Sequence, residues 1–136
     1  MATIQDAIEG IQDLVGAVSG IREAPDYAPE GIRIFPFAVA YASAGSFEFG
    51  VAGEMKGLHD IAVEIHVARK NMRTALKTAM GFSDAVPAAI MADPTLGGDV
   101  DTFGSISYTF GAMNYGEMQT IGFRFIVTDV KIRTDL

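Results

Sequence analysis

The feature that most constrains the fold is a regular alternation of apolar residues with smaller or polar ones in several short stretches. In residues 60–69 every second position is an isoleucine or a valine, and residues 105–110 and 121–127 repeat the pattern with aromatic residues included. Successive side chains of a strand point to opposite faces, so each stretch predicts a β-strand with one apolar face. A chain with several such strands must bury those faces against another layer.

Two further features extend the predicted sheet. Residues 32–41 predict a fourth strand with apolar residues on both parities, so we expect both of its faces to be covered. Pro36 lacks an N–H for a ladder hydrogen bond, which favours an edge position or a bulge there. Beyond the strand that starts at Ile121, the apolar positions change parity at Val130 and Ile132; a β-bulge near Thr128-Asp129 would return them to the core.

Three stretches have the 3.6-residue spacing of helices. The first carries apolar residues from Ile4 to Val18 and begins with Thr3 and Asp6 in the arrangement of a capping box. The second presents an apolar stripe after Asn71, and the third is short. The expected limits are Thr3 to Ser19-Gly20, Asn71 to Gly81, and Ser83 or Asp84 to Pro94.

The resulting element order is α-β-β-α-α-β-β. It predicts an α+β fold with a four-stranded, largely antiparallel sheet packed with an N-terminal helix and a central helical segment. We expect a single domain over residues 1–136, because neither a repeat nor a domain boundary interrupts the pattern. Residues 111–118 are expected to form the loop between the last two strands.

The charges are unevenly distributed along the chain. The net charge is −7, which argues against a protein that grips nucleic acid by its phosphates. Residues 1–30 contain six acidic residues and one basic residue, whereas residues 56–77 contain five basic and two acidic ones. Such patches suit self-association, in which the acidic first helix would face residues 69–77 of a neighbour; the alternative is simply solvated helix faces. A mean hydropathy of +0.26 favours apolar surface kept for subunit contacts, although a large core would give the same value.

The chain contains no cysteine, which excludes disulfides, thiol nucleophiles and thiolate metal sites. The longest uncharged run, residues 34–47, is interrupted by Pro36 and is too short to span a bilayer. A signal peptide requires basic residues near its start, and this sequence has no basic residue before Arg22. We therefore expect no membrane association, and a protein that works in a cytoplasm or in an assembled particle.

The segment DPTLGGDVD, residues 93–101, concentrates acids and glycines. An EF-hand calcium loop needs oxygen ligands at its third and fifth positions among others, and the fifth position here is Gly97. A phosphate cradle needs glycines that lead directly into a helix, whereas these lead into acids and a strand. The segment predicts a structural turn, in which Pro94 ends a helix and Gly97 and Gly98 adopt conformations closed to other residues. No metal site is expected.

The catalytic candidate is a pair formed by Glu64 and His66, which share one face of a strand. An exposed or interface pair is the preferred interpretation, because nothing in the sequence assembles a nucleophile, a base and an oxyanion hole. The G-x-S-x-G elbow of hydrolases is also absent from the sequence. We therefore expect no catalytic residue, no cofactor and no enzyme activity.

Residues 42–59 form the most informative connection. They combine four glycines with Phe47, Phe49, Val51 and Met55. A connection of this length in a compact domain is usually functional or disordered, and disordered segments are poor in such residues. We expect a long loop with two open interpretations: a hairpin packed on its own domain, or a flexible arm that becomes ordered against a neighbouring subunit.

Three motifs in the second half of the chain are DPTLGGDVDTF, ISYTFGAMNYGEM and QTIGFRFIVTDVKIR. Together with the N-terminal helix, the first strand pair around a long loop and the length of 136 residues, they resemble the tail terminator (tail completion) proteins of long-tailed phages with non-contractile tails. The resemblance covers nearly the whole chain.

This resemblance implies a structural virion protein without catalysis. Members form a ring of six subunits that caps the tail tube, stops polymerisation of the tube protein and offers the surface for joining the tail to the head. The implied partners are other copies of the chain, the tail tube protein and a head-tail connector or neck protein. The implied location is the head-proximal end of the tail in the virion, with assembly in the host cytoplasm. DNA passes through the ring without specific binding, which the negative net charge suits.

The expected subunit or partner interface consists of Phe47, Phe49, Val51, Met55, Arg69, Lys70 and Arg73. Two alternatives stay open. One is another neck, connector or tail tube protein, from a phage or a gene transfer particle, of which the tube protein would polymerise into long tubes. The other is a small ligand-binding α+β domain, which would bind a small molecule saturably.

Overall fold

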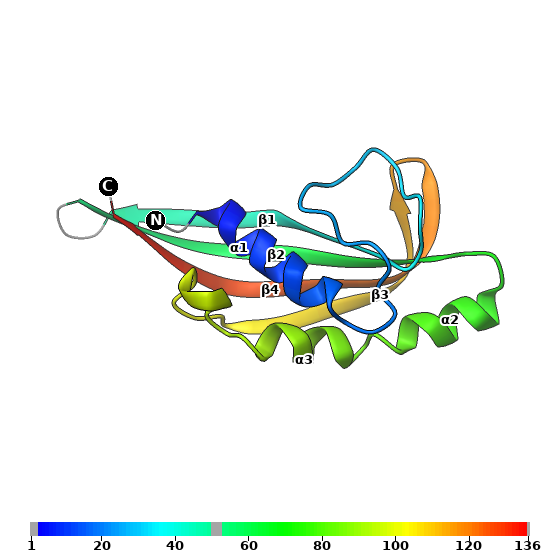
Figure 1. Cartoon of the computed structure of the whole chain (residues 1–136). Coiled ribbons are helices and arrows are strands. Elements are labelled where there is room, and N and C mark those ends of the chain that lie inside the picture. Colours follow the sequence, from blue (N-terminus) through cyan, green and yellow to red (C-terminus); the bar gives the residue numbers. More distant parts are fainter. Residues whose placement is uncertain (1–2, 50–52, 136) are drawn as a thin grey trace.

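One antiparallel sheet, covered on one face by helices, makes up the protein (Figure 1). The computed structural model describes residues 3–49 and 53–135. Its strands follow the order β1-β2-β4-β3 with antiparallel neighbours, which confirms the predicted α+β class and element order. The elements are α1 (Ile4–Gly16), β1 (Phe37–Phe49), β2 (Glu54–Ala68), α2 (Met72–Met80), α3 (Ala85–Met91), the short 3-10 helix η1 (Leu96–Gly98), β3 (Ser105–Tyr115) and β4 (Met118–Asp135).

The helix-covered face of the sheet holds the main core. The alternating apolar residues of β2 and β4 are almost completely buried there together with residues of α1, α2 and α3. They are Ile61, Val63, Ile65 and Val67 in β2, and Ile121, Phe123, Phe125 and Val127 in β4. Burial of these side chains is the main favourable term that holds the helices on the sheet.

Helix α1 begins as its sequence predicts. The Thr3 hydroxyl accepts a hydrogen bond from the backbone N of Asp6 (3.1 Å), and the Asp6 carboxylate accepts one from the backbone N of Thr3 (2.9 Å), so the capping box is confirmed. Gly10, which is unfavourable inside a helix, lies under a buried leucine: a Cβ at this position would be 3.3 Å from Cβ of Leu96. The glycine therefore lets η1 approach the helix.

Helix α2 keeps its predicted limits, whereas α1 and α3 both end earlier than predicted; α3 ends at Met91, before the predicted Pro94, and the side chain of its N-cap Asp84 makes no capping hydrogen bond. Asn71 caps α2 by accepting a hydrogen bond from the backbone N of Thr74 (3.2 Å), and Gly81 is its C-cap, as predicted. Helix α1 ends at Gly16, earlier than the predicted Ser19-Gly20. The residues between them form turns rather than a further helical turn.

Two β-bulges beside Asp60 interrupt the register of the sheet. In β4 the pairing with β2 shifts at Thr128-Asp129, as the change of parity predicted; the second of these residues has a φ of 55° and its backbone N donates to the Asp60 carboxylate (3.3 Å). In β1 the pairing shifts at Ser43, whose hydroxyl donates to the Asp60 carbonyl (3.1 Å). The apolar residues of β4 beyond the bulge consequently stay buried in the core.

Beyond these bulges the sheet continues as three strands, residues 44–49, 54–59 and 130–135, which we call the sheet arm. Figure 1 shows the sheet arm extending past the start of α1. The prediction of a long loop over residues 42–59 is wrong, because the described residues 42–49 and 54–59 form paired strands. Residues 42–49 are all exposed, so ladder hydrogen bonds rather than burial hold them and no apolar alternation marks them as a strand.

Two other predicted boundaries need correction. The first strand begins at Phe37 rather than at residue 32, and Pro36 directly precedes it; β1 is nevertheless an edge strand, the position that the proline favoured. Residues 111–118 are mostly strand, since β3 continues to Tyr115 and β4 starts at Met118. Gly111 lies inside β3, whereas Gly116, with a φ of 59°, lies in the turn between β3 and β4.

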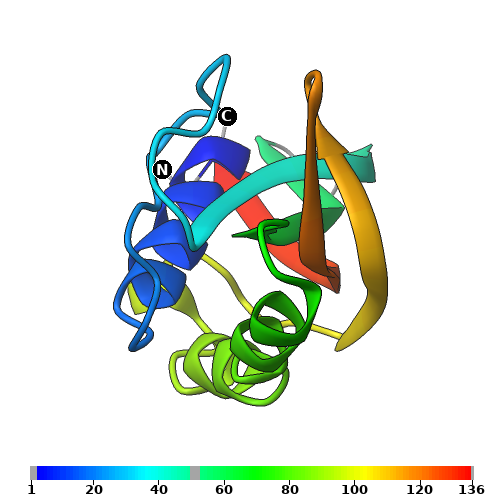
Figure 2. The ribbon, with the colours of Figure 1, turned by 90° about the vertical axis from the view of Figure 1, so that its right-hand side faces the viewer.

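The β3–β4 hairpin bends to the side of the sheet opposite the helices (Figure 2). Gly111 of β3 faces Gly122 of β4, and a Cβ on Gly122 would lie only 1.8 Å from the carbonyl oxygen of Ile65. The glycine at position 122 allows this close approach of the β4 backbone to the β2 backbone. The bend brings Tyr115 against Phe37, with ring centroids 5.5 Å apart. A second, smaller core forms there from Ile32, Phe35, Phe37, Val39 and Tyr115.

Candidate functional site

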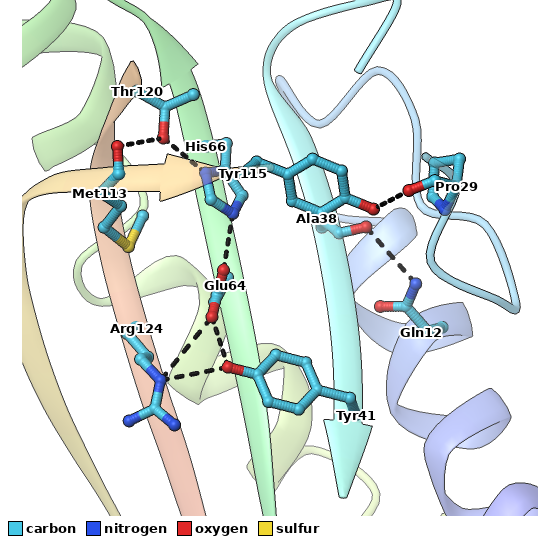
Figure 3. A network of polar contacts seen from close by, with 10 residues as sticks. All are labelled: Gln12, Pro29, Ala38, Tyr41, Glu64, His66, Met113, Tyr115, Thr120 and Arg124. Atoms are coloured by element: carbon cyan, nitrogen blue, oxygen red, sulfur yellow. Dashed lines mark hydrogen bonds and ion pairs between the residues drawn. The ribbon is translucent and has the colours of Figure 1, made fainter. Parts of the chain in front are cut away.

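The face of the sheet opposite the helices carries a connected set of polar side chains (Figure 3). Glu64 of β2 uses both carboxylate oxygens: Oε1 accepts a hydrogen bond from Nε2 of His66 (2.8 Å), and Oε2 accepts one from the Tyr41 hydroxyl of β1. Oε2 also lies 3.7 Å from Nε of Arg124 on β4, which donates to the Tyr41 oxygen (3.2 Å). Glu64 and Arg124 are direct partners in the β2–β4 register, so strand pairing brings them together.

His66 is completely buried at 0% exposure. Since a carboxylate only accepts hydrogen bonds, Nε2 is the donor to Glu64, and Nδ1 shares a hydrogen bond with Oγ1 of Thr120 (2.6 Å). The rings of Tyr115 and Phe37 pack against it, with centroids 5.4 Å and 6.3 Å away. Both ring nitrogens are therefore engaged within the protein, and the expectation of an exposed pair is wrong for this histidine.

The protonation states follow from the same contacts. Burial opposes ionisation of Glu64, but hydrogen bonds from His66 and Tyr41 outweigh it and hold the pKa of this carboxyl below its ordinary value. Burial and the hydrogen bond to Glu64 raise the pKa of Tyr41. An ionised and fully paired carboxylate beside an inaccessible imidazole is poorly placed for general acid–base work. We interpret this network as a set of structural contacts that join β1, β2 and β4.

The sheet arm carries the most exposed aromatic surface. Phe49 is 83% exposed and Phe47 is 54% exposed, and Met55 on the paired strand is half-buried. Val51, the fourth apolar residue predicted for the interface, lies outside the described residues. Clustered apolar side chains at a surface mark contact sites. The residues named from the sequence thus gather on the arm, although the loop expected to carry them is a strand pair.

His59 forms the floor of a hollow of about 210 Å³ between the sheet arm and the start of α1. Its ring lies against two glycines: a Cβ on Gly45 or on Gly57 would come within 2.3 Å of a ring nitrogen. Phe47 packs on the ring with its edge, at a centroid distance of 5.0 Å. Nε2 has no hydrogen-bond partner among the described residues, and burial lowers the pKa of His59. The two glycines in the arm therefore make room for a neutral imidazole.

Residues 93–99 form a tight turn beside α1. Gly97 and Gly98 have φ values of 70° and 101°, which confirms that they adopt conformations unfavourable for other residues. The backbone N of Gly97 donates to the Asp93 carboxylate (3.3 Å), and Pro94 follows α3, which ends at Met91. The turn lets the buried Leu96 pack on the helix.

The turn and α1 together line a hollow of about 320 Å³ whose wall carries carboxylates from both segments. They are Asp6, Glu9 and Asp13 of α1, and Asp93 and Asp99 of the turn. Within residues 3–49 and 53–135, none of these carboxylates forms an ion pair with a basic side chain. The sequence indicated two separate acidic segments, and only the fold joins them into one surface, which we call the acidic hollow.

The basic residues predicted for the interface lie elsewhere. Arg69, Lys70 and Arg73 are exposed at the start of α2, where Arg69 donates a hydrogen bond to the side chain of Gln119 (3.3 Å). Figure 1 places α2 at the end of the molecule opposite the sheet arm. The predicted interface residues therefore form two separate groups, an aromatic group on the arm and a basic group on α2.

In the described part of the chain, no group of three or more histidine, aspartate or glutamate side chains is arranged to hold a metal ion. The helices described are all too short or too polar to cross a membrane. No family model and no curated protein matches this chain. The resemblance to tail terminators therefore remains a hypothesis based on the motifs and element order of this sequence.

Proposed function

We propose that this protein is a structural subunit that assembles into a closed ring and terminates a phage tail tube. Its copies would form a ring of six, cap the tube formed by the tail tube protein, and present a surface to the head-tail connector or neck protein. The proposed location is the head-proximal end of the tail in the virion. The proposal assigns no catalysis and no cofactor to the chain.

The observation that carries this proposal is the exposed sheet arm. The arm extends past α1 and presents Phe47 and Phe49, which are 54% and 83% exposed, on a strand at the edge of the sheet. Burying one phenylalanine side chain contributes roughly 1.5–3 kcal/mol. Covering the two exposed phenylalanine side chains of the arm with another protein would therefore be energetically favourable.

Open edges of the sheet support assembly as well. In the described residues, the outer sides of β1 and β3 pair with no further strand apart from an isolated bridge between Glu23 and Phe37. Unpaired edges are templates for pairing with another chain. Contacts between unlike surfaces of identical subunits form a ring if the rotation closes, or a filament if it does not.

The negative net charge of −7 supports the passage of DNA through the ring. Carboxylates facing a lumen repel phosphates, so DNA would slide without sticking. This part of the proposal predicts that the assembled ring binds double-stranded DNA no more tightly than other acidic proteins do.

The test begins with the oligomeric state of the purified protein, measured by native mass spectrometry and electron microscopy. The protein should form closed rings, and when it is added to polymerising tail tube protein it should cap tubes at one end and limit their length. The variant Phe47→Ser with Phe49→Ser should weaken assembly by more than about 100-fold in concentration. A protein that stays monomeric at every concentration and leaves tube growth unchanged would refute the proposal.

A matched control distinguishes the arm from aromatic surface in general. Tyr27 is 70% exposed and lies in the connection between α1 and β1, away from the arm. Tyr27→Ser should leave ring formation unchanged. If Tyr27→Ser and the arm variant lose assembly equally, the claim that the arm forms the subunit contact is contradicted.

A second candidate, a tail tube or connector protein, is favoured by the same open edges of β1 and β3, because they allow contacts that do not close. The imaging experiment separates the two functions. Tubes that grow with concentration would identify a tube protein, whereas rings of constant size support the terminator.

A further inference from the structure

We propose that the exposed face of α2 is a docking surface for a second copy of this chain, and that its counterpart is the acidic hollow of that copy. The inference deepens the proposed function, since it names one contact by which neighbouring subunits would meet. It is independent of the aromatic residues of the sheet arm.

Helix α2 presents two adjacent stripes to solvent. Met72, Leu76 and Met80 recur every four residues and are 45%, 37% and 51% exposed. A helix buries such a stripe when it lies against a partner. The sides that face the sheet are occupied by Ala75 and Ala79, which are almost completely buried.

The second stripe of α2 is basic. Arg73 and Lys77 lie four residues apart on the helix, Arg69 lies two residues before its N-cap Asn71, and all three are exposed. Over the described ranges, none of them forms an ion pair. Helix α2 and the residues just before it therefore combine an apolar stripe with basic side chains that pair with no carboxylate in the described part of the subunit.

The acidic hollow has the complementary composition. Its wall carries the carboxylates of α1 and of the turn, and its apolar part consists of Leu14 and the buried Leu96. Gly10 and Gly97 also line it, so part of its surface carries no side chain. Crowded carboxylates repel one another, and cations placed among them remove that repulsion.

The two surfaces lie apart on the same molecule, which makes the contact intermolecular. Figure 1 shows α2 at one end, while the turn around η1, coloured yellow-green, lies below α1 toward the other end. A contact between α2 of one copy and the acidic hollow of the next is head-to-tail, the type of contact that builds rings. The apolar stripe supplies affinity, and the charges select the partner and the register.

The decisive experiment reverses charges on each surface separately and then combines them. The first variant carries Arg73→Glu and Lys77→Glu on α2, and the second carries Glu9→Lys and Asp13→Lys in the hollow. Each variant alone should raise the concentration needed for half-assembly by roughly tenfold or more at low salt. An equimolar mixture of the two should assemble again, because each reversed surface then meets its opposite in the other variant.

A charge-matched control reverses Arg22 and Arg33, two exposed arginines of the connection between α1 and β1, to glutamate. This control should assemble like the unchanged protein, as measured by mass photometry, and circular dichroism should show that all variants are folded. The cysteine-free chain also allows a direct test: Lys77→Cys mixed with Asp13→Cys should form a disulfide between copies when oxidised glutathione is added as the oxidant.

The outcomes separate this inference from the proposed function. Rings that form equally well in both reversal variants, with no disulfide between copies, would overturn the α2 contact and leave the terminator proposal intact. Reversal variants that fail alone and fail when mixed would also overturn it. A wild-type chain that never self-associates would overturn both.

Discussion

Replacing Gly122 by alanine should be one of the most damaging single substitutions in this protein. Gly122 lies in β4 opposite Gly111, where the β3–β4 hairpin bends over the sheet. A Cβ at Gly122 would lie 1.8 Å from the carbonyl oxygen of Ile65 in the neighbouring strand β2. Carbon–oxygen contacts between strands are normally about 3.3 Å or longer, so β2 and β4 would have to separate locally by about 1.5 Å.

The expected cost can be worked from the interactions at this point. Separating the strands weakens about two ladder hydrogen bonds, at about 1 kcal/mol each. Overpacking of an interior site costs about 1–3 kcal/mol in addition. The free energy of unfolding should therefore fall by about 3–5 kcal/mol, a large share of the roughly 5–15 kcal/mol that stabilises a typical domain.

The assay is equilibrium unfolding in urea, followed by circular dichroism. With a denaturant slope of roughly 2 kcal/mol per molar, the midpoint should fall by about 2 M. The matched control is Gly31→Ala, where the added Cβ meets nothing within 4 Å. The free energy of unfolding of this variant should differ from that of the unchanged protein by less than about 0.5 kcal/mol. If Gly122→Ala is destabilised by less than about 1 kcal/mol, the argument from the close backbone approach is incorrect.

Three further predictions concern other parts of the fold. Because burial lowers the pKa of His59 below its ordinary value of 6.5, the unfolded chain takes up a proton that the folded protein excludes as the pH falls through 6.5. Urea unfolding should therefore show stability decreasing between about pH 7 and about pH 5.5, and less so in His59→Phe. Gly97→Val should lower the free energy of unfolding by more than about 1 kcal/mol, because its φ of 70° is strained for valine; an unchanged urea midpoint would contradict this. Asp99→Asn and Asp101→Asn should leave the response to calcium unchanged, and calorimetric binding of calcium that Asp99→Asn abolishes would contradict the structural interpretation of the turn.

Local sequence patterns were sufficient for the fold class. Alternation over residues 60–69 and 121–127 identified the core strands, because burial of one face imposes a period of two. The change of parity after residue 127 located the bulge at Thr128-Asp129, because a bulge lets the apolar residues before and after it face the same core. Asn71 and Gly81 set the limits of α2, because capping depends on neighbouring residues only.

The strands without a buried face could not be predicted in this way. Residues 42–49 and 111–115 are held by pairing with other strands and contain glycines, so no periodic pattern distinguishes them from loops. The aromatic residues of the arm were predicted to be contact residues, while the strand pair that presents them was not predicted. Strand pairing depends on residues far away in the chain, which a local pattern does not encode.

The sequence by itself determined the secondary structure of the core, the polarity of each strand face and the presence of unused aromatic and charged residues. Only the tertiary structure decided which of these residues meet. Glu64, Tyr41 and Arg124 come from three strands and share one network because of the register, and the acidic residues of α1 meet those of residues 93–99 because Gly10 lets Leu96 approach the helix. The physical reason is that such contacts are set by packing between distant segments, whereas periodicity reports only the environment of each segment alone.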